Sequence, residues 1–214
     1  MGNSFGARPR KRRVVIQGLR SSGVSSVLRS LNLGRVHVAN PSANFFLEVV
    51  TFKNCVFSAW TTGEASQWAY FYKNADALIF VVDASSEADL EAAKKVLRRI
   101  LLGDDALDSA KILILANKQD KGLFDANDVT QKLELFKLPQ EWHVQPTVAI
   151  DGGRGLLEGL DWLSAALANT PDKDDDDLCL KTPLQMLLGT TKANHFITRV
   201  SELADCWPNN SKRT

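Results

Sequence analysis

The sequence predicts an α/β fold: a mostly parallel six-stranded sheet with helices on both faces and one antiparallel edge strand. Continuous apolar runs, typical of strands buried on both faces, recur along the chain. Stretches with apolar residues at helical spacing lie between them. Two early strand-like runs are joined only by Lys53 and Asn54, which predicts a hairpin and therefore the antiparallel strand.

Each element follows from its local pattern, in chain order. Residues 14–16 predict a buried strand, and a turn rich in Gly and Ser spans residues 18–23. Residues 24–33 predict a helix, because their apolar side chains share one helical face. The other predicted strands are 45–52, 55–60, 77–82, 112–116 and 144–150, and the other predicted helices are 87–102, 129–136 and 156–167.

Composition and charge bound the function. The chain has 214 residues and a net charge of +1, so the whole molecule is not a polycation that binds nucleic acid. The three cysteines are odd in number and widely spaced, which argues against a disulfide framework and a zinc site. No apolar run approaches the ~20 residues that span a bilayer. We therefore expect a soluble intracellular protein.

Three segments are predicted along the chain. Residues 1–13 form a basic N-terminal segment, residues 14–169 form the folded domain, and residues 170–214 form a tail. The tail begins with an acidic linker, residues 172–177. Farther on, Phe196, Val200 and Leu203 repeat at helical spacing and predict a short amphipathic helix.

The first functional motif is a phosphate loop. Gly18 to Ser25 follow a strand and open a helix in the layout G-x-x-x-x-G-K-[ST], with Val24 at the lysine position. Glycines let backbone N–H groups turn inward around a phosphate, and the Ser25 hydroxyl suits Mg²⁺. An ordinary Gly–Ser turn before a helix is the alternative. The candidate phosphate-contacting residues are Gly18, Ser21, Ser22, Gly23, Val24, Ser25 and Ser26.

The second motif is Asn117–Lys118–Gln119–Asp120, just after a buried strand. The Asp120 carboxylate can accept hydrogen bonds from both N1–H and N2–H₂ of guanine, a donor pair that adenine lacks. Asn117 can brace the loop and face the base, and the Lys118 stem can lie along the ring. A backbone N–H near Ala149 or Ile150 can meet guanine O6. The alternative is a polar loop that contains these residues by chance.

These motifs belong to a longer ordered set. The chain resembles the ADP-ribosylation factor and Arf-like branch of the small GTPases over roughly residues 1 to 169. The resemblance is carried by Met1–Gly2–Asn3, Gly18–Ser25, Pro41–Ser42, Phe45, Phe52–Lys53–Asn54, Phe57, Trp60, Leu78–Asp83, Asn117–Asp120 and Glu158–Leu163.

The resemblance implies a Ras-like P-loop GTPase fold that binds GTP or GDP with Mg²⁺. It places Ser25 and Ser42 on the metal. It also implies effector or regulator proteins as partners, no nucleic acid, and a role in vesicle traffic or related processes.

The phosphate-handling residues depart from the family pattern. Val24 replaces the lysine, Thr61 replaces an aspartate that supports Mg²⁺, and Ala65 replaces a glutamine that orients water. Glu64 stands where a glycine is expected and would repel the γ-phosphate. The sequence therefore predicts guanine binding with weak or absent hydrolysis, and we assign no catalytic residue. A nucleotide-free pseudo-GTPase scaffold is the alternative.

Arg20 lies within the phosphate loop. It either replaces the missing cation or points to solvent, and the sequence leaves both open.

The N-terminus resembles the family's myristoylated start, with Gly2 as the lipidation site, although Gly6 stands where Ser or Thr is usual. Arg8 to Arg13 would supply the second, electrostatic signal that one acyl chain needs. We expect a cytoplasmic protein peripheral on intracellular membranes. A nuclear-import-like basic run and a solvated tail are the alternatives.

Overall fold

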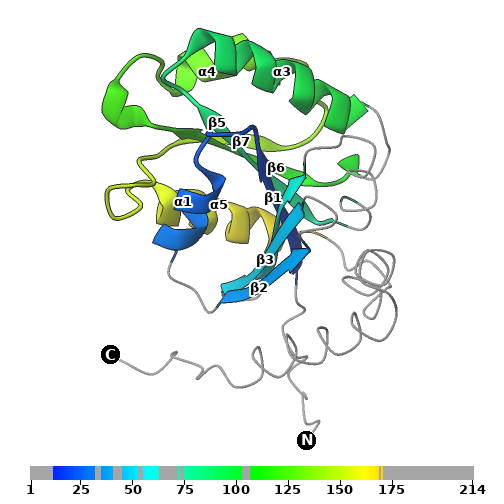
Figure 1. The fold of residues 1–214 in the computed structure, drawn as a ribbon. Helices are drawn as coiled ribbons and strands as arrows, with labels where there is room; N and C mark the ends of the chain where they lie inside the picture. The colour runs from blue at the N-terminus through cyan, green and yellow to red at the C-terminus, as the bar shows by residue number, and fades with distance from the viewer. Residues whose placement is uncertain are drawn as a thin grey trace, which may run out of the picture.

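The computed structural model describes residues 12–31, 35–40, 45–52, 55–62, 72, 75–102, 107–168 and 170, with 35–62 described as backbone only (Figure 1). The predicted N-terminal segment, residues 1–13, and the predicted tail, residues 170–214, lie outside these ranges, apart from Arg12, Arg13 and Thr170. No helix within the described ranges is long and apolar enough to cross a membrane.

One sheet of seven strands in the order β2-β3-β4-β1-β5-β6-β7 forms the centre of the described residues. Strands β4, β1, β5, β6 and β7 pair in parallel, and β3 is antiparallel to both neighbours. The strands are β1 Arg12–Gly18, β2 Arg35–Asn40, β3 Phe45–Phe52, β4 Cys55–Thr62, β5 Ala77–Asp83, β6 Lys111–Asn117 and β7 Trp142–Pro146.

Helices cover both faces, α3 and α4 on one and α1 and α5 on the other (Figure 1). Alternate residues of the central strands enter two separate cores. Val15, for example, packs with the α3–α4 layer, and Val14 and Ile16 pack with the α1–α5 layer. The helices are α1 Val24–Ser30, α3 Glu87–Leu102, α4 Ala126–Leu133 and α5 Leu156–Ala168, with 3-10 turns η4 Gln119–Lys121 and η5 Leu135–Lys137.

The α/β class, the parallel sheet and the helices on both faces agree with the sequence prediction. The predicted strand count of six and the antiparallel edge strand are not confirmed, because β2 adds a strand outside β3. β2 pairs with β3 over six residues, and both neighbours of β3 are antiparallel to it. The strand that runs opposite to the others is therefore β3, inside the sheet, and the edge strand β2 runs in the same direction as β4. In the sequence of β2, apolar Val36 and Val38 alternate with polar Arg35 and His37, so this strand does not form a continuous apolar run.

Three elements differ from the prediction by more than two residues at one end. Helix α1 ends at Ser30 rather than at residue 33. β7 ends at Pro146 rather than at residue 150, because its ladder with β6 stops at the Ala116–Pro146 pair. The predicted helix 129–136 is two elements: α4 starts at Ala126 with Asp125 in a capping box, and Glu134 at φ 55° breaks it before η5.

Candidate functional site

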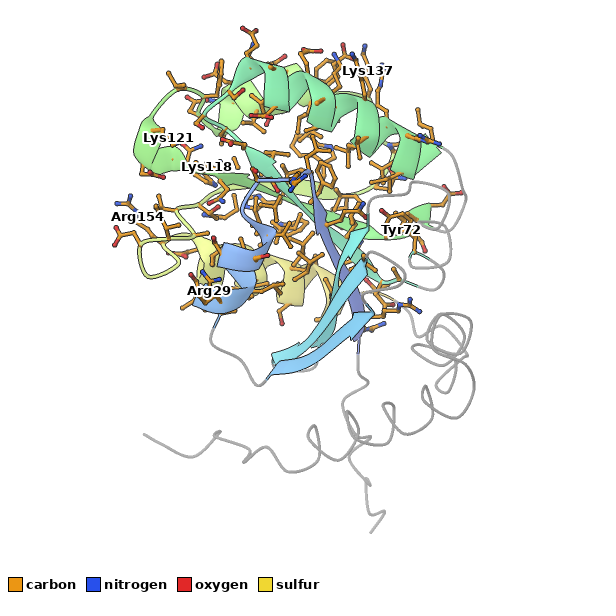
Figure 2. All side chains as sticks on the ribbon, in the orientation of Figure 1. Arg29, Tyr72, Lys118, Lys121, Lys137 and Arg154 are labelled. Atoms are coloured by element: carbon orange, nitrogen blue, oxygen red, sulfur yellow. The ribbon has the colours of Figure 1, made fainter. Side chains whose placement is uncertain are left out.

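The motifs predicted from the sequence meet at one edge of the sheet. β1 and β6 are parallel and flank β5, so the loops after Gly18 and Asn117 leave at the carboxyl ends of the strands. The turn after β7 joins them there. Ligands of open α/β folds bind at this edge. In Figure 2, Lys118, Lys121 and Arg154 lie on this same side of the molecule.

The phosphate loop is a tight turn between β1 and α1. The Ser22 amide donates to the Leu19 carbonyl at 3.1 Å, and the first bond of the helix runs from Val27 N to Gly23 O at 2.9 Å. The amides of residues 24–26 therefore have no helical acceptor. These donors suit a phosphate group, since they point out of the start of a helix next to a glycine turn.

Each glycine of the loop is required by a close approach. A Cβ on Gly18 would lie 2.4 Å from Ser22 Oγ and 2.6 Å from the Val81 carbonyl oxygen. A Cβ on Gly23 would lie 2.2 Å from Asn117 Nδ2, and Gly23 has φ +106°. Only glycine fits either place without displacing its neighbours.

The other loop side chains differ in exposure. Val24 is 5% exposed and packs in the α1–α5 core, so an apolar side chain occupies the lysine position. Ser25 and Ser21 are exposed, Ser26 is half-buried, and Arg20 is exposed. The Ser22 hydroxyl is buried with no hydrogen-bond partner among the residues that the structure describes.

Asn117 joins three loops. Its Nδ2 donates to the Ser22 carbonyl at 2.9 Å, and its Oδ1 accepts from the Ala149 amide at 3.0 Å and from Thr147 Oγ1 at 3.4 Å. The side chain is buried, so these bonds are shielded from water. The bracing contact expected of Asn117 is present, and it links the phosphate loop to the base-recognition loops.

Lys118 is held by a carboxylate that the sequence analysis did not single out as a site residue. Its Nζ donates to Asp83 at the end of β5, and Asp83 also accepts from Ser85 N at 2.9 Å and Ser85 Oγ at 2.6 Å. Burial alone would raise the pKa of Asp83, but the bonds from Lys118 and Ser85 outweigh it and hold that pKa below its ordinary value. The Lys118 stem is thereby tethered beside the loop.

The predicted base-reading groups lie next to this tether. Lys118 has φ 67°, and the η4 turn that follows presents Asp120 to solvent. Within the described part of the chain, nothing bonds the Asp120 carboxylate, so it is open to a ligand. The Ala149 N–H is already engaged by Asn117, which makes the exposed Ile150 the better source of a free N–H.

Sequence reasoning missed two further supports of these loops. The Ser30 hydroxyl at the end of α1 donates to the Ala149 carbonyl, and a Cβ on Gly153 would lie 3.0 Å from Ser30 Cβ. Asp83 could have been found as a polar residue closing a buried strand. Ser30 could not, because 119 residues separate it from Ala149.

Several predicted site residues lie outside the part of the chain that the structure describes. Gly2, Ser42, Glu64 and Ala65 fall in residues that the structure does not describe, and Thr61 is described only as a backbone position of β4 paired with Phe46.

The described groups fit a magnesium–nucleotide complex. Amides at the start of α1 suit phosphate oxygens, the exposed Ser25 hydroxyl suits a hard cation, and the Asp120 carboxylate suits guanine. In such a complex, Mg²⁺ would neutralise phosphate charge.

Comparison with known proteins agrees with this arrangement. A sequence model of the ADP-ribosylation factor family matches residues 2–167, most of the chain. Members of this family bind GTP or GDP with Mg²⁺ and interact with effector and regulator proteins. The match spans the phosphate loop, the Asn117–Asp120 motif and the turn after β7. The chain therefore belongs to the ADP-ribosylation factor family of GTP-binding small GTPases.

Proposed function

We propose that this protein binds guanine nucleotides, distinguishes GTP from GDP poorly and hydrolyses GTP weakly or not at all. One observation carries the proposal: the buried Asn117 side chain bonds both the phosphate loop and the turn after β7, while Asp120 is left exposed. Among the residues that the structure describes, Asp120 has no bonded partner, so its carboxylate is available to read a base beside the loops that Asn117 joins.

We expect the phosphates to be bound weakly because Val24 stands at the lysine position. A lysine there would add a charged hydrogen bond worth about 1.5–3 kcal/mol. Val24 instead packs in the core, so its side chain offers the phosphates no charge. Loss of that bond corresponds to an affinity lower by roughly one to two decades.

The weak hydrolysis follows from the sequence of the second switch. Thr61, Glu64 and Ala65 replace residues that support Mg²⁺, contact the γ-phosphate and orient water in this family. Ser25 and Ser42 keep hydroxyls for the metal, so we propose that Mg²⁺ is bound but held less firmly.

We further propose a membrane-tethered regulator of vesicle traffic or a related process, cytoplasmic and peripheral on intracellular membranes. Support comes from Gly2 and from the basic run Arg8–Arg13, which together supply an acyl chain and an electrostatic signal. Traffic itself is proposed from family membership alone.

One observation favours a second candidate, a nucleotide-free scaffold. Val24 joins α1 to the core through apolar contacts, which gives the loop a structural role that needs no phosphate. In that case the exposed Asp120 would be idle.

The decisive experiment changes the base that Asp120 reads. Asn at position 120 would offer a donor and an acceptor, which suit xanthine N1–H and O2 rather than the two donors of guanine. We expect the wild-type protein to bind fluorescent GDP and GTP with similar affinity and to reject ADP. We expect Asp120→Asn to lose at least tenfold in GDP affinity and to gain XDP.

Asp108→Asn, an exposed aspartate in the turn before β6, is the matched control and should leave GDP binding unchanged. Wild-type protein that binds no guanine nucleotide at millimolar GDP and Mg²⁺ would reject the proposal in favour of the scaffold.

A further inference from the structure

A buried polar pair joins the strand before the phosphate loop to the segment before β5. The Tyr72 hydroxyl donates to Gln17 Oε1, and both side chains are buried, at 2% and 8% exposed. Gln17 directly precedes Gly18, the first residue of the phosphate loop. The Tyr72 ring packs in the α3–α4 core, in the same cluster as Val15 and Phe80.

This pair is costly to break. Burial raises the pKa of Tyr72 well above its ordinary value, so the phenol keeps its proton and remains a donor at all physiological pH values. Removing one partner would leave the other buried without a hydrogen bond, whereas removing both is nearly neutral. The bond therefore specifies where Gln17 sits.

The same short segment also holds the beginning of β1. The Arg13 amide donates to Asp76 Oδ2 at 2.8 Å, and the Asp76 amide donates to the Arg13 carbonyl at 2.8 Å. The Ala75 amide closes onto the Tyr72 carbonyl at 3.0 Å, which ties Tyr72 to Asp76. Asp76 thus attaches to β1 near the start of the strand, and Tyr72 attaches to it near the end.

We propose that Tyr72 is a positioning residue for the phosphate loop. By its bond to Gln17 it fixes the end of β1, where the phosphate loop starts, relative to the α3–α4 core in which its ring packs. The effect of Tyr72 on nucleotide release rests on the proposed function. Its effect on the position of the loop does not, because the hydrogen bond to Gln17 needs no nucleotide.

The test compares amide hydrogen exchange of the full-length protein with Tyr72→Phe, without nucleotide. Loop amides exchange through local opening, and the slowest amides of β5 and β6 exchange through global unfolding. If Tyr72 positions the loop, exchange at residues 18–26 should rise at least fivefold. If its role is merely structural, only the slow amides of β5 and β6 will speed up, and that result would overturn the proposal.

Two further variants sharpen the test. Tyr70→Phe removes the chain's other tyrosine hydroxyl and should leave loop exchange unchanged. Gln17→Leu with Tyr72→Phe removes both polar groups, so we expect the melting temperature to recover while loop exchange stays high. Loop exchange that returns to the wild-type rate in this double variant would also count against the hydrogen bond.

Nucleotide release separates this inference from the proposed function. We expect Tyr72→Phe to release fluorescent GDP about five times faster than the wild type does. If loop exchange rises but no variant binds GDP, the positioning role stands and the proposed guanine binding fails. If GDP binds and neither loop exchange nor release changes, the positioning role fails.

Discussion

The conformation of the phosphate loop depends on close contacts that individual residues make. Gly23 combines a left-handed backbone with a contact that leaves no room for a Cβ, because Asn117 Nδ2 occupies that space. The same Asn117 nitrogen bonds the carbonyl of the preceding Ser22. Backbone conformation, packing and hydrogen bonding therefore converge on one position, which makes it the most sensitive point of the described loop.

We expect Gly23→Ala to lower the free energy of unfolding by about 4 kcal/mol, the sum of backbone strain and a broken buried hydrogen bond. Urea unfolding followed by tryptophan fluorescence measures it. Gly122→Ala is the control, since Gly122 has φ +60° but nothing within 4 Å of its added Cβ. Gly122→Ala should lower the free energy of unfolding by only about 1–2 kcal/mol. Equal losses in the two variants would show that the Asn117 contact contributes nothing.

At the scale of elements, the register of β5 against β6 builds the base side of the site. Asp83 pairs with Asn117 across the two strands, and the Ala84 amide donates to the Asn117 carbonyl at 3.0 Å. This register brings the Asp83 carboxylate within reach of Lys118. A shift of one residue would turn these side chains to the opposite face and separate the ion pair.

Glu134, directly after α4, forms ion pairs that join α4 to α3. Glu134 accepts from Lys137 Nζ at 2.8 Å and from Lys94 Nζ at 2.9 Å, and Arg98 lies 3.3 Å away. The hydrogen bonds from Lys137 and Lys94 lower the pKa of Glu134 to about 2. Because the folded-state pKa is below the ordinary value of 4.5, the carboxylate stabilises the fold above pH 4.5 and loses this effect as the pH falls towards 2.

We therefore expect Glu134→Gln to lower the melting temperature at pH 7 by a few degrees and to bring it level with the wild type near pH 2. Thermal unfolding across pH 2–7 measures this difference. Glu158→Gln, on the exposed face of α5, serves as the comparison and should run parallel to the wild type. A gap between Glu134→Gln and the wild type that is constant across this range would exclude the carboxylate as its cause.

At the scale of the whole molecule, the first strand and the last helix are joined. Arg12 at the start of β1 donates to the Thr170 carbonyl just after α5, at 2.8 Å, and lies 3.7 Å from Asp76. This hydrogen bond joins two residues that are 158 positions apart in the sequence, one at each end of the described domain. In the sequence, a basic run, residues 8–13, lies at one end of this domain, and the acidic residues 172–177 follow the other end.

The proposed membrane tether is a property of the whole chain. We expect Gly2→Ala to move the protein from the membrane fraction to the soluble fraction of its own cells, because a basic run alone binds weakly and salt removes it. Intact mass spectrometry should show a myristoyl group on the wild type and none on the variant. An unmodified Gly2 in the wild type would remove the lipid part of the proposal.

Much of this arrangement could be predicted because its signals are local. The strands β5 and β6 were predicted from the continuous apolar runs 77–82 and 112–116, and α3 keeps its predicted bounds. The glycines of the phosphate loop and the Asn117–Asp120 motif occur at short, fixed spacings. β2 was not predicted, because a strand of six residues that are partly polar is recognised only from its pairing with a neighbouring strand, here β3.

The sequence by itself determined the fold class, the family, the guanine-reading motif and the loss of the phosphate-loop lysine, since each depends on neighbouring residues. Only the tertiary structure decided which groups hold that motif in place: Asp83 on Lys118, Ser30 on Ala149, and Tyr72 on Gln17. These partners are 35 to 119 residues apart. Contacts at such separations arise from strand order and packing, which leave no pattern in a short stretch of sequence.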